Sequence, residues 1–147
     1  MATTTSALDS VQQLTRERER IVRELAQLSD ADCRSPAQWS GVQRNVNFLL
    51  RAFSLHELDH LQHLNKLLAA RGRRFSEAQI LLSKAQALRG EVEALLLSLS
   101  DEEFDAAGQE PEDWSIRQLV EHLAKVDAMY ADNIRASVKQ GRSATPA

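Results

Sequence analysis

The stretch VQRNVNFLLRAFSLHELDHLQHLNKL, residues 42–67, carries a row of side chains at alternating steps of four and three residues. This spacing keeps residues on one face of an α-helix. Partway along, the row changes from apolar to imidazole side chains, and its members are Val42, Val46, Leu49, Phe53, His56, His60, His63 and Leu67. We therefore expect a helix whose core-facing side presents histidines where the pattern calls for leucine.

The histidine spacing suggests a metal site. His56 and His60 are four residues apart, so their rings project from adjacent turns of one helix face and can bind the same metal ion. His122 lies on a second expected helix. We hypothesise that His122 supplies a third nitrogen, which leaves coordination positions open for water or substrate.

A structural interpretation of the same histidines stands beside this one. A buried neutral imidazole that lacks a hydrogen-bond partner costs roughly 1 to 3 kcal/mol, so core histidines normally have partners. On this interpretation His56, His60 and His122 are hydrogen-bonded core residues without a metal. Two interpretations of His63 are favoured equally: an alternative metal ligand, or a residue at the edge of the surface. Both are preferred to a role in supporting another ligand.

Composition bounds the class of protein. A chain of 147 residues with 43% hydrophobic and 27% charged residues predicts one soluble globular domain with a single core. The net charge of -3 argues against a nucleic-acid-binding surface.

Cys33 is the only cysteine, which excludes an internal disulfide and favours a reducing compartment. No signal-peptide pattern or membrane-length apolar run occurs, so we expect a cytoplasmic protein without a membrane partner.

Hydrophobic periodicity predicts four helices and no strands, an all-α fold. The expected helices cover about residues 7–28, 40–70, 76–99 and 115–139. Three Ser-x-x-Gln capping boxes, at 40–43, 76–79 and 115–118, open the last three of these helices. We expect a single bundle over residues 7–140, with disordered segments at 1–6 and 141–147.

Two further details concern local packing. Gly90 interrupts the third expected helix at a cost of about 1 kcal/mol relative to alanine, which indicates either close packing or simple tolerance. Trp114 precedes the last capping box and is expected to pack on Leu119 as a hydrophobic staple. The polar segment between Ser100 and Asp113 is expected to be a loop.

The chain repeats a pair of short motifs. Leu-Ser-Asp at 28–30 followed by Trp-Ser-x-x-Gln at 39–43 recurs at 99–101 and 114–118. The repeat predicts two similar helical hairpins packed as a four-helix bundle. If the second and fourth helices cross antiparallel about a pseudo-two-fold axis, His122 comes level with the His56 and His60 pair.

Two segments resemble a known family. LHELDHLQHL, residues 55–64, is similar to the helix that supplies a His-x-x-x-His pair in the DinB/YfiT-like four-helix bundles of bacteria. WSIRQLVEHLAKVDAMY, residues 114–130, resembles that family's helix with a Trp-Ser cap followed by a histidine. With the repeat, the resemblance covers roughly residues 14–139. In the family the Trp-Ser helix comes first, whereas here the order is reversed.

The resemblance implies a divalent metal ion, commonly nickel or zinc, held by His56, His60 and His122 with water completing the coordination. It also implies a homodimer. Some relatives are thiol-dependent transferases or isomerases that use low-molecular-weight thiols such as mycothiol or bacillithiol. We therefore expect a metal-binding protein that, if catalytic, is an S-transferase or isomerase acting on a small molecule. Glu57 and Glu121 point away from the ligand face on helix geometry, so no catalytic base is named.

Two other classes of protein fit the same sequence. The first is a non-catalytic helical module for interaction or dimerisation, in which the histidines are structural. The second is a bundle that binds a small apolar ligand in a pocket lined by Phe53, Leu123 and Met129, again without a metal.

Overall fold

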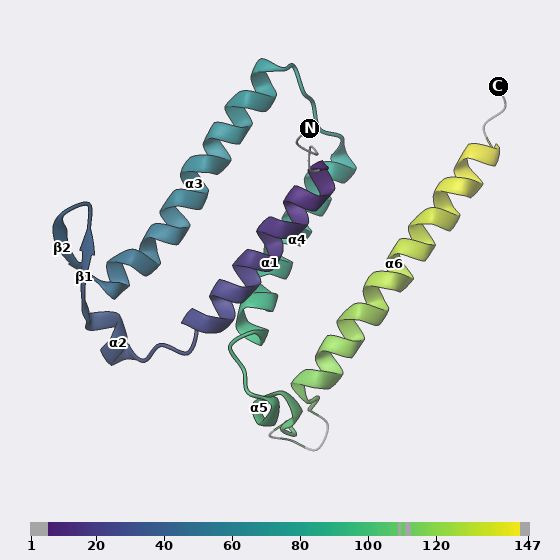
Figure 1. Ribbon diagram of the computed structural model, residues 1–147. Helices are drawn as coiled ribbons and strands as arrows, with labels where there is room; N and C mark the ends of the chain where they lie inside the picture. Colours follow the sequence, from purple (N-terminus) through teal and green to yellow (C-terminus); the bar gives the residue numbers. More distant parts are fainter. Residues whose placement is uncertain (1–5, 109, 111–112, 145–147) are drawn as a thin grey trace. The chain divides into compact units, whose positions relative to one another are not determined.

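The computed structural model of the protein describes residues 6–108, 110 and 113–144 (Figure 1). Its contacts divide the chain into a first unit, Met1–Ser98, and a second unit, Leu99–Ala147. The described residues are mainly helical, which confirms the helical class, and they include one antiparallel two-stranded sheet that was not predicted.

The first unit begins with helix α1, Ala7–Leu25, which contacts α4, Glu77–Leu96, in the same unit (Figure 1). Ser6 caps α1 by accepting a hydrogen bond from the backbone N–H of Asp9 at 3.1 Å, so this residue of the segment predicted to be disordered is ordered. The helix ends three residues earlier than expected, because Ser29 opens a new short helix. That helix, α2, covers Asp30–Arg34 and contains Cys33.

A β-hairpin replaces the predicted start of the second long helix. Strand β1, Pro36–Trp39, pairs with β2, Val42–Asn45, and Trp39 lies opposite Val42. Helix α3, Val46–Ala70, begins only after the hairpin, where the Asn45 side chain accepts from the backbone N–H of Phe48 at 2.9 Å. The predicted capping box at residues 40–43 is therefore wrong, and Val42 does not belong to the helical row.

The turn between the two strands explains the difference. Ser40 and Gly41 have φ angles of 49° and 76°. Positive φ at both central residues is the pattern of a type I′ turn, which fits the twist of a two-residue hairpin. In the repeated motif Ile116 stands where Gly41 stands here, and a β-branched residue is strained at positive φ. One glycine thus gives the two copies of the motif different structures.

The other predicted helix boundaries agree with the structure more closely. Ser76 and Gln79 form the expected capping box at the start of α4. Helix α3 ends at Ala70 as predicted, and Gly72 follows with a φ of 64°. In the left-handed region glycine has no Cβ penalty, which is why it stops a helix there.

The second unit contains helix α5, Asp101–Asp105, and helix α6, Ile116–Ala144. Helix α5 lies in the segment predicted to be a loop and starts with a capping box between Ser100 and Glu103. Helix α6 continues beyond the predicted end of the bundle at residue 140, so residues 141–144 are helical. The remaining residues of the two segments predicted to be disordered, 1–5 and 145–147, lie outside the described residues.

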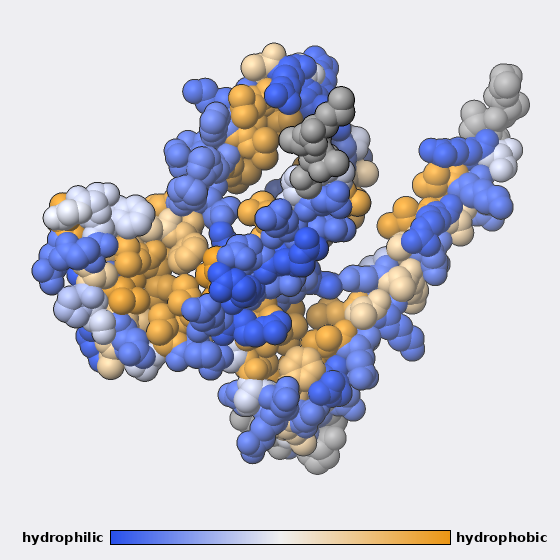
Figure 2. Space-filling model, in the orientation of Figure 1, coloured by the Kyte–Doolittle hydropathy of each residue, from blue (hydrophilic) through white to orange (hydrophobic). Residues whose placement is uncertain are grey.

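The apolar faces of the helices remain open. None of the described residues is buried, and Figure 2 shows apolar side chains on the surface along α3 and α6. The expectation of a single shared core stays a prediction. Helical periodicity identifies the face of a helix that needs cover but not the element that covers it. Open apolar faces include Val11 and Leu14 in α1 and Tyr130 and Ile134 in α6.

Candidate metal site

Helix α3 brings His56 and His60 together as the spacing predicts. Their Nε2 atoms lie 3.1 Å apart. The ring centroids are separated by 4.4 Å, with the ring planes at 78° to each other. The two rings therefore meet at their Nε2 corners rather than stacking face to face.

The nitrogen separation suits two ligands of one metal ion. Bonds of about 2.0–2.1 Å from metal to nitrogen place neighbouring ligand nitrogens about 2.9 Å apart at a right angle and about 3.4 Å apart at the tetrahedral angle. The observed 3.1 Å falls between these values. The same distance also fits a hydrogen bond between two neutral imidazoles, one donating and the other accepting.

The four histidine side chains share one feature, which is their exposure to solvent. His56, His60, His63 and His122 are all exposed in the structure. An exposed imidazole exchanges hydrogen bonds with water, so burial does not oblige these rings to find a partner in the protein. The structural interpretation of the histidines therefore stays an alternative to metal binding.

His63 continues the row one turn beyond the pair. Its ring centroid lies 6.3 Å from that of His60, with the planes tilted by 31°. This separation exceeds the 4.4 Å between the rings of the pair. His63 is therefore best described as an exposed neighbour of the pair.

His122 lies in the second unit, on the second turn of α6. The indole ring of Trp114 contacts it, with the centroids 4.7 Å apart and the planes at 62°, an edge-to-face arrangement. The predicted staple put Trp114 on Leu119. The indole ring contacts His122, which lies three residues beyond Leu119 on the same face of the helix, and the staple on Leu119 stays a prediction. That spacing was the only sequence signal for this contact.

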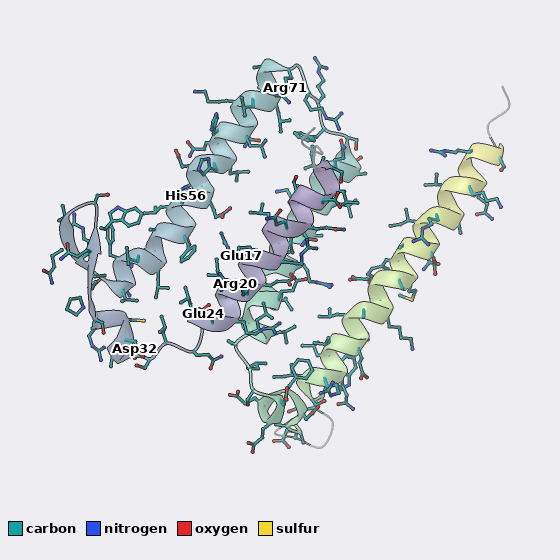
Figure 3. The ribbon with its side chains drawn as sticks, viewed as in Figure 1. Glu17, Arg20, Glu24, Asp32, His56 and Arg71 are labelled. Atoms are coloured by element: carbon teal, nitrogen blue, oxygen red, sulfur yellow. The ribbon has the colours of Figure 1, made fainter. Side chains whose placement is uncertain are left out.

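Charged side chains of α1 form ion pairs within that helix and with α3. Arg18 of α1 donates a hydrogen bond to the carboxylate of Glu57, the residue after His56. Glu17 pairs with Arg20 at 2.7 Å, and Arg20 also pairs with Glu24 at 3.0 Å, along one side of α1 (Figure 3). Hydrogen bonding from Arg20, followed by its positive charge, lowers the pKa of Glu17. Glu17 therefore belongs to a salt-bridged face, as the alternating charges of α1 indicate.

A complete ligand set is not assembled in the structure. Among residues 6–108, 110 and 113–144, no three His, Cys, Asp or Glu side chains form a group that could hold a metal ion. Two of the predicted ligands, His56 and His60, come together in the first unit. The third predicted ligand, His122, belongs to the second unit.

The first unit contains a cleft that Phe53 helps to line. The cleft has a volume of about 840 Å³ and lies between α1, α3 and α4. Gly90 also lines this cleft, and a Cβ atom built at Gly90 would meet nothing within 4 Å. Within the first unit no neighbouring atom requires a glycine at this position, so the helix simply tolerates Gly90. Leu123 and Met129, the other expected lining residues, are in the second unit.

In the part of the chain that the structure describes, no helix combines the length and apolar character needed to cross a bilayer. A scan against protein-family models, a search of curated proteins and a search of solved structures each found no match.

Proposed function

We propose that the protein is a DinB-like four-helix bundle that binds a divalent metal ion, nickel or zinc, through His56, His60 and His122. The observation that carries the proposal is the 3.1 Å separation between the Nε2 atoms of His56 and His60. Two imidazole nitrogens at this distance form a ready-made pair of neighbouring ligands.

In the proposed bundle the long helices α1, α3, α4 and α6 pack around a shared core. Two features support this arrangement. Helix α6 has an apolar row that includes Leu119, Tyr130 and Ile134, all exposed. The first unit offers a cleft lined partly by Leu14, Phe53 and Leu97. Burying such rows stabilises a bundle by about 25 cal/mol for each Å² of apolar surface removed from water.

The chain's residues have distinct parts in this proposal. His56 and His60 hold the ion from adjacent turns of one helix, and His122 adds a third nitrogen. Three protein ligands leave open positions for water or a small molecule. A metal ion bound there would lower the pKa of a water or thiol ligand and would thereby supply a nucleophile. The proposed reaction class is thiol-dependent S-transfer or isomerisation with a low-molecular-weight thiol, in a cytoplasmic homodimer.

A second candidate is a non-catalytic interaction or dimerisation module. The exposed apolar faces of α3 and α6 favour it, because large open apolar surfaces on a protein usually mark contact sites. The small-ligand alternative is supported by the cleft of about 840 Å³, which both apolar and charged side chains line. Neither candidate requires a metal ion, so metal content separates both from the leading proposal.

Metal content should be measured by elemental analysis on protein purified without a histidine tag. We expect close to one nickel or zinc ion per chain for the natural sequence and a large loss in His60→Ala. Asn65→Ala is the matched control, since it removes an exposed polar side chain of the same helix, and it should keep the metal. Fewer than about 0.2 ions per chain in the natural protein, after loading with metal, would contradict the proposal, because a formed site binds its ion tightly.

The catalytic part needs a separate assay. Metal-loaded protein should conjugate a model electrophile with at least one cellular low-molecular-weight thiol, and His60→Ala should not. If no thiol supports turnover while metal content is normal, the transferase proposal fails and the metal-binding proposal stands.

A further inference from the structure

The cleft of the first unit has apolar walls that are open to solvent. Leu14 and Val22 line it from α1, Phe53 from α3, and Leu97 from the end of α4. Leu14 is 69% exposed and Phe53 is 37% exposed. Sites for small molecules bury most of the ligand surface, whereas these walls leave one side uncovered. An elongated apolar partner therefore suits the cleft better than a small molecule.

The cleft has the length of a short helix. Its lining residues extend from Leu14 to Val22 along α1 and from Ala87 to Leu97 along α4. At about 1.5 Å per residue these spans measure about 12 Å and about 15 Å, or two to three helical turns. Three small residues of α4 lie on the face that lines the cleft, and small side chains let another helix approach closely. They are Ala87, Gly90 and Ala94.

The charged side chains of the cleft are mainly carboxylates. Arg18 and Glu57 form an ion pair with each other. Glu19, Glu91 and Glu93 also line the cleft, and among the residues that the structure describes they form no ion pair. The cleft therefore combines an apolar surface with three negative charges that lack a partner of opposite sign.

We propose that this cleft is a docking site for an amphipathic, positively charged helix of a partner protein. The apolar side chains of that helix, at positions i, i+3 or i+4, and i+7, pack on the apolar walls of the cleft. Lysine or arginine side chains beside the apolar row pair with the three carboxylates, and this complementarity selects a basic helix over an acidic one. The inference rests on the interaction module, the second candidate function, and requires no metal ion.

Fluorescence anisotropy with the full-length protein and three labelled peptides of about 15 residues tests the proposal. The first peptide has leucines on one helical face and lysines beside them. The second has glutamates in place of the lysines, and the third has the composition of the first in an order without an apolar face. The first should bind, and the other two should bind at least about tenfold more weakly. Binding of the first should weaken in about 1 M NaCl.

Substitution of two carboxylates tests the charge complementarity. The double variant Glu91→Gln, Glu93→Gln should bind the leucine-lysine peptide roughly threefold to tenfold more weakly, the effect of two exposed ion pairs. Glu77→Gln is the matched control. It makes the same change in the same helix, at a residue that is not among those lining the cleft, and it should leave the Kd unchanged.

Substitution of Gly90 tests the apolar part of the site. A Cβ atom there would meet nothing within 4 Å, so the indole of Gly90→Trp can enter the cleft and fill it. This variant should lose the peptide while it keeps the helical circular-dichroism signal. Gly90→Ala is the control, because its methyl group leaves the cleft open, and it should bind the peptide as the natural protein does.

Three results would overturn the docking site. The first is a natural protein that does not bind the leucine-lysine peptide, and the second is equal binding of the peptide without an apolar face. The third is equal binding by the natural protein, the double glutamine variant and Gly90→Trp, which would place the peptide elsewhere on the surface. None of these results alters the metal content of the protein, so the docking site and the metal site fail separately.

Discussion

Arg18 in α1 is ion-paired with Glu57 in α3, the residue that follows His56. The guanidinium carbon of Arg18 also lies 5.5 Å from the centroid of the Phe53 ring, one turn before Glu57. One side chain of α1 therefore contacts two turns of the helix that carries the histidine pair. The Arg18 and Glu57 side chains are 43% and 58% exposed, so water screens the attraction between them.

A double-mutant cycle with Arg18→Ala, Glu57→Ala and the double variant should measure this connection. We expect a coupling free energy of about 0.2–1 kcal/mol from urea unfolding at low salt, the range of exposed ion pairs. The coupling should shrink in about 1 M NaCl, where the screening length falls to a few ångströms. A coupling free energy of zero at low salt would show that α1 and α3 are not joined by this pair.

Substitution of Gly41 should destabilise the protein. Its φ of 76° lies in the left-handed region, where a side chain meets the backbone, so Gly41→Ala should lower the free energy of unfolding by about 1–2 kcal/mol. A steric clash with neighbouring residues is not the cause, since a Cβ atom at Gly41 would meet nothing within 4 Å. Chemical denaturation measures the change. An unaltered stability would be inconsistent with the hairpin turn.

Substitution of Gly90 should act in the opposite direction. Gly90 lies inside α4, and a Cβ atom would meet nothing within 4 Å, so Gly90→Ala should raise the free energy of unfolding by about 0.5–1 kcal/mol through helix propensity. Chemical denaturation measures this change in the free energy of unfolding, and Gly41→Ala, which should lower it, is the comparison. A clear destabilisation would instead reveal close packing against Gly90 in solution.

Acid should weaken the link between α5 and α6. Hydrogen bonding from Arg117, with a smaller contribution from its charge, lowers the pKa of Asp105 below its ordinary value of 3.8. The Asp105 carboxyl therefore binds a proton less tightly in the folded protein than in the unfolded chain. The stabilisation is therefore complete above the ordinary pKa and disappears as the pH falls through the lower, folded value.

Thermal unfolding between about pH 5 and about pH 2 tests this effect. The natural protein should lose more of its Tm on acidification than Asp105→Asn, which cannot titrate at this position. Asp59→Asn removes one exposed negative charge from α3 and is the control. Equal losses in the natural protein and in Asp105→Asn would exclude a role for the Arg117 pair.

Much of the local structure could be predicted because it depends on neighbours within four residues. The caps at Ser76 and Ser115 and the end of α3 at Ala70 follow from such rules. The hairpin was missed because Val42 continues the helical spacing of the following row. The Ser40-Gly41 pair was the available signal, since such dipeptides mark turns.

For the candidate site, too, the sequence predicts geometry within one helix but not the packing between helices. His56 and His60 could be paired from sequence, because the geometry within one helix is fixed. The position of His122 relative to that pair depends on how helices pack, which periodicity does not determine. The contact between Trp114 and His122 was also missed, since the staple rule stops at Leu119, one turn earlier.

The most direct test of the metal site is to count the imidazole ligands on bound nickel by X-ray absorption spectroscopy. We predict three imidazoles in the natural protein, two in His122→Ala and three in His63→Ala. A natural protein with only two imidazoles on nickel, unchanged in His122→Ala, would contradict the site formed by His56, His60 and His122.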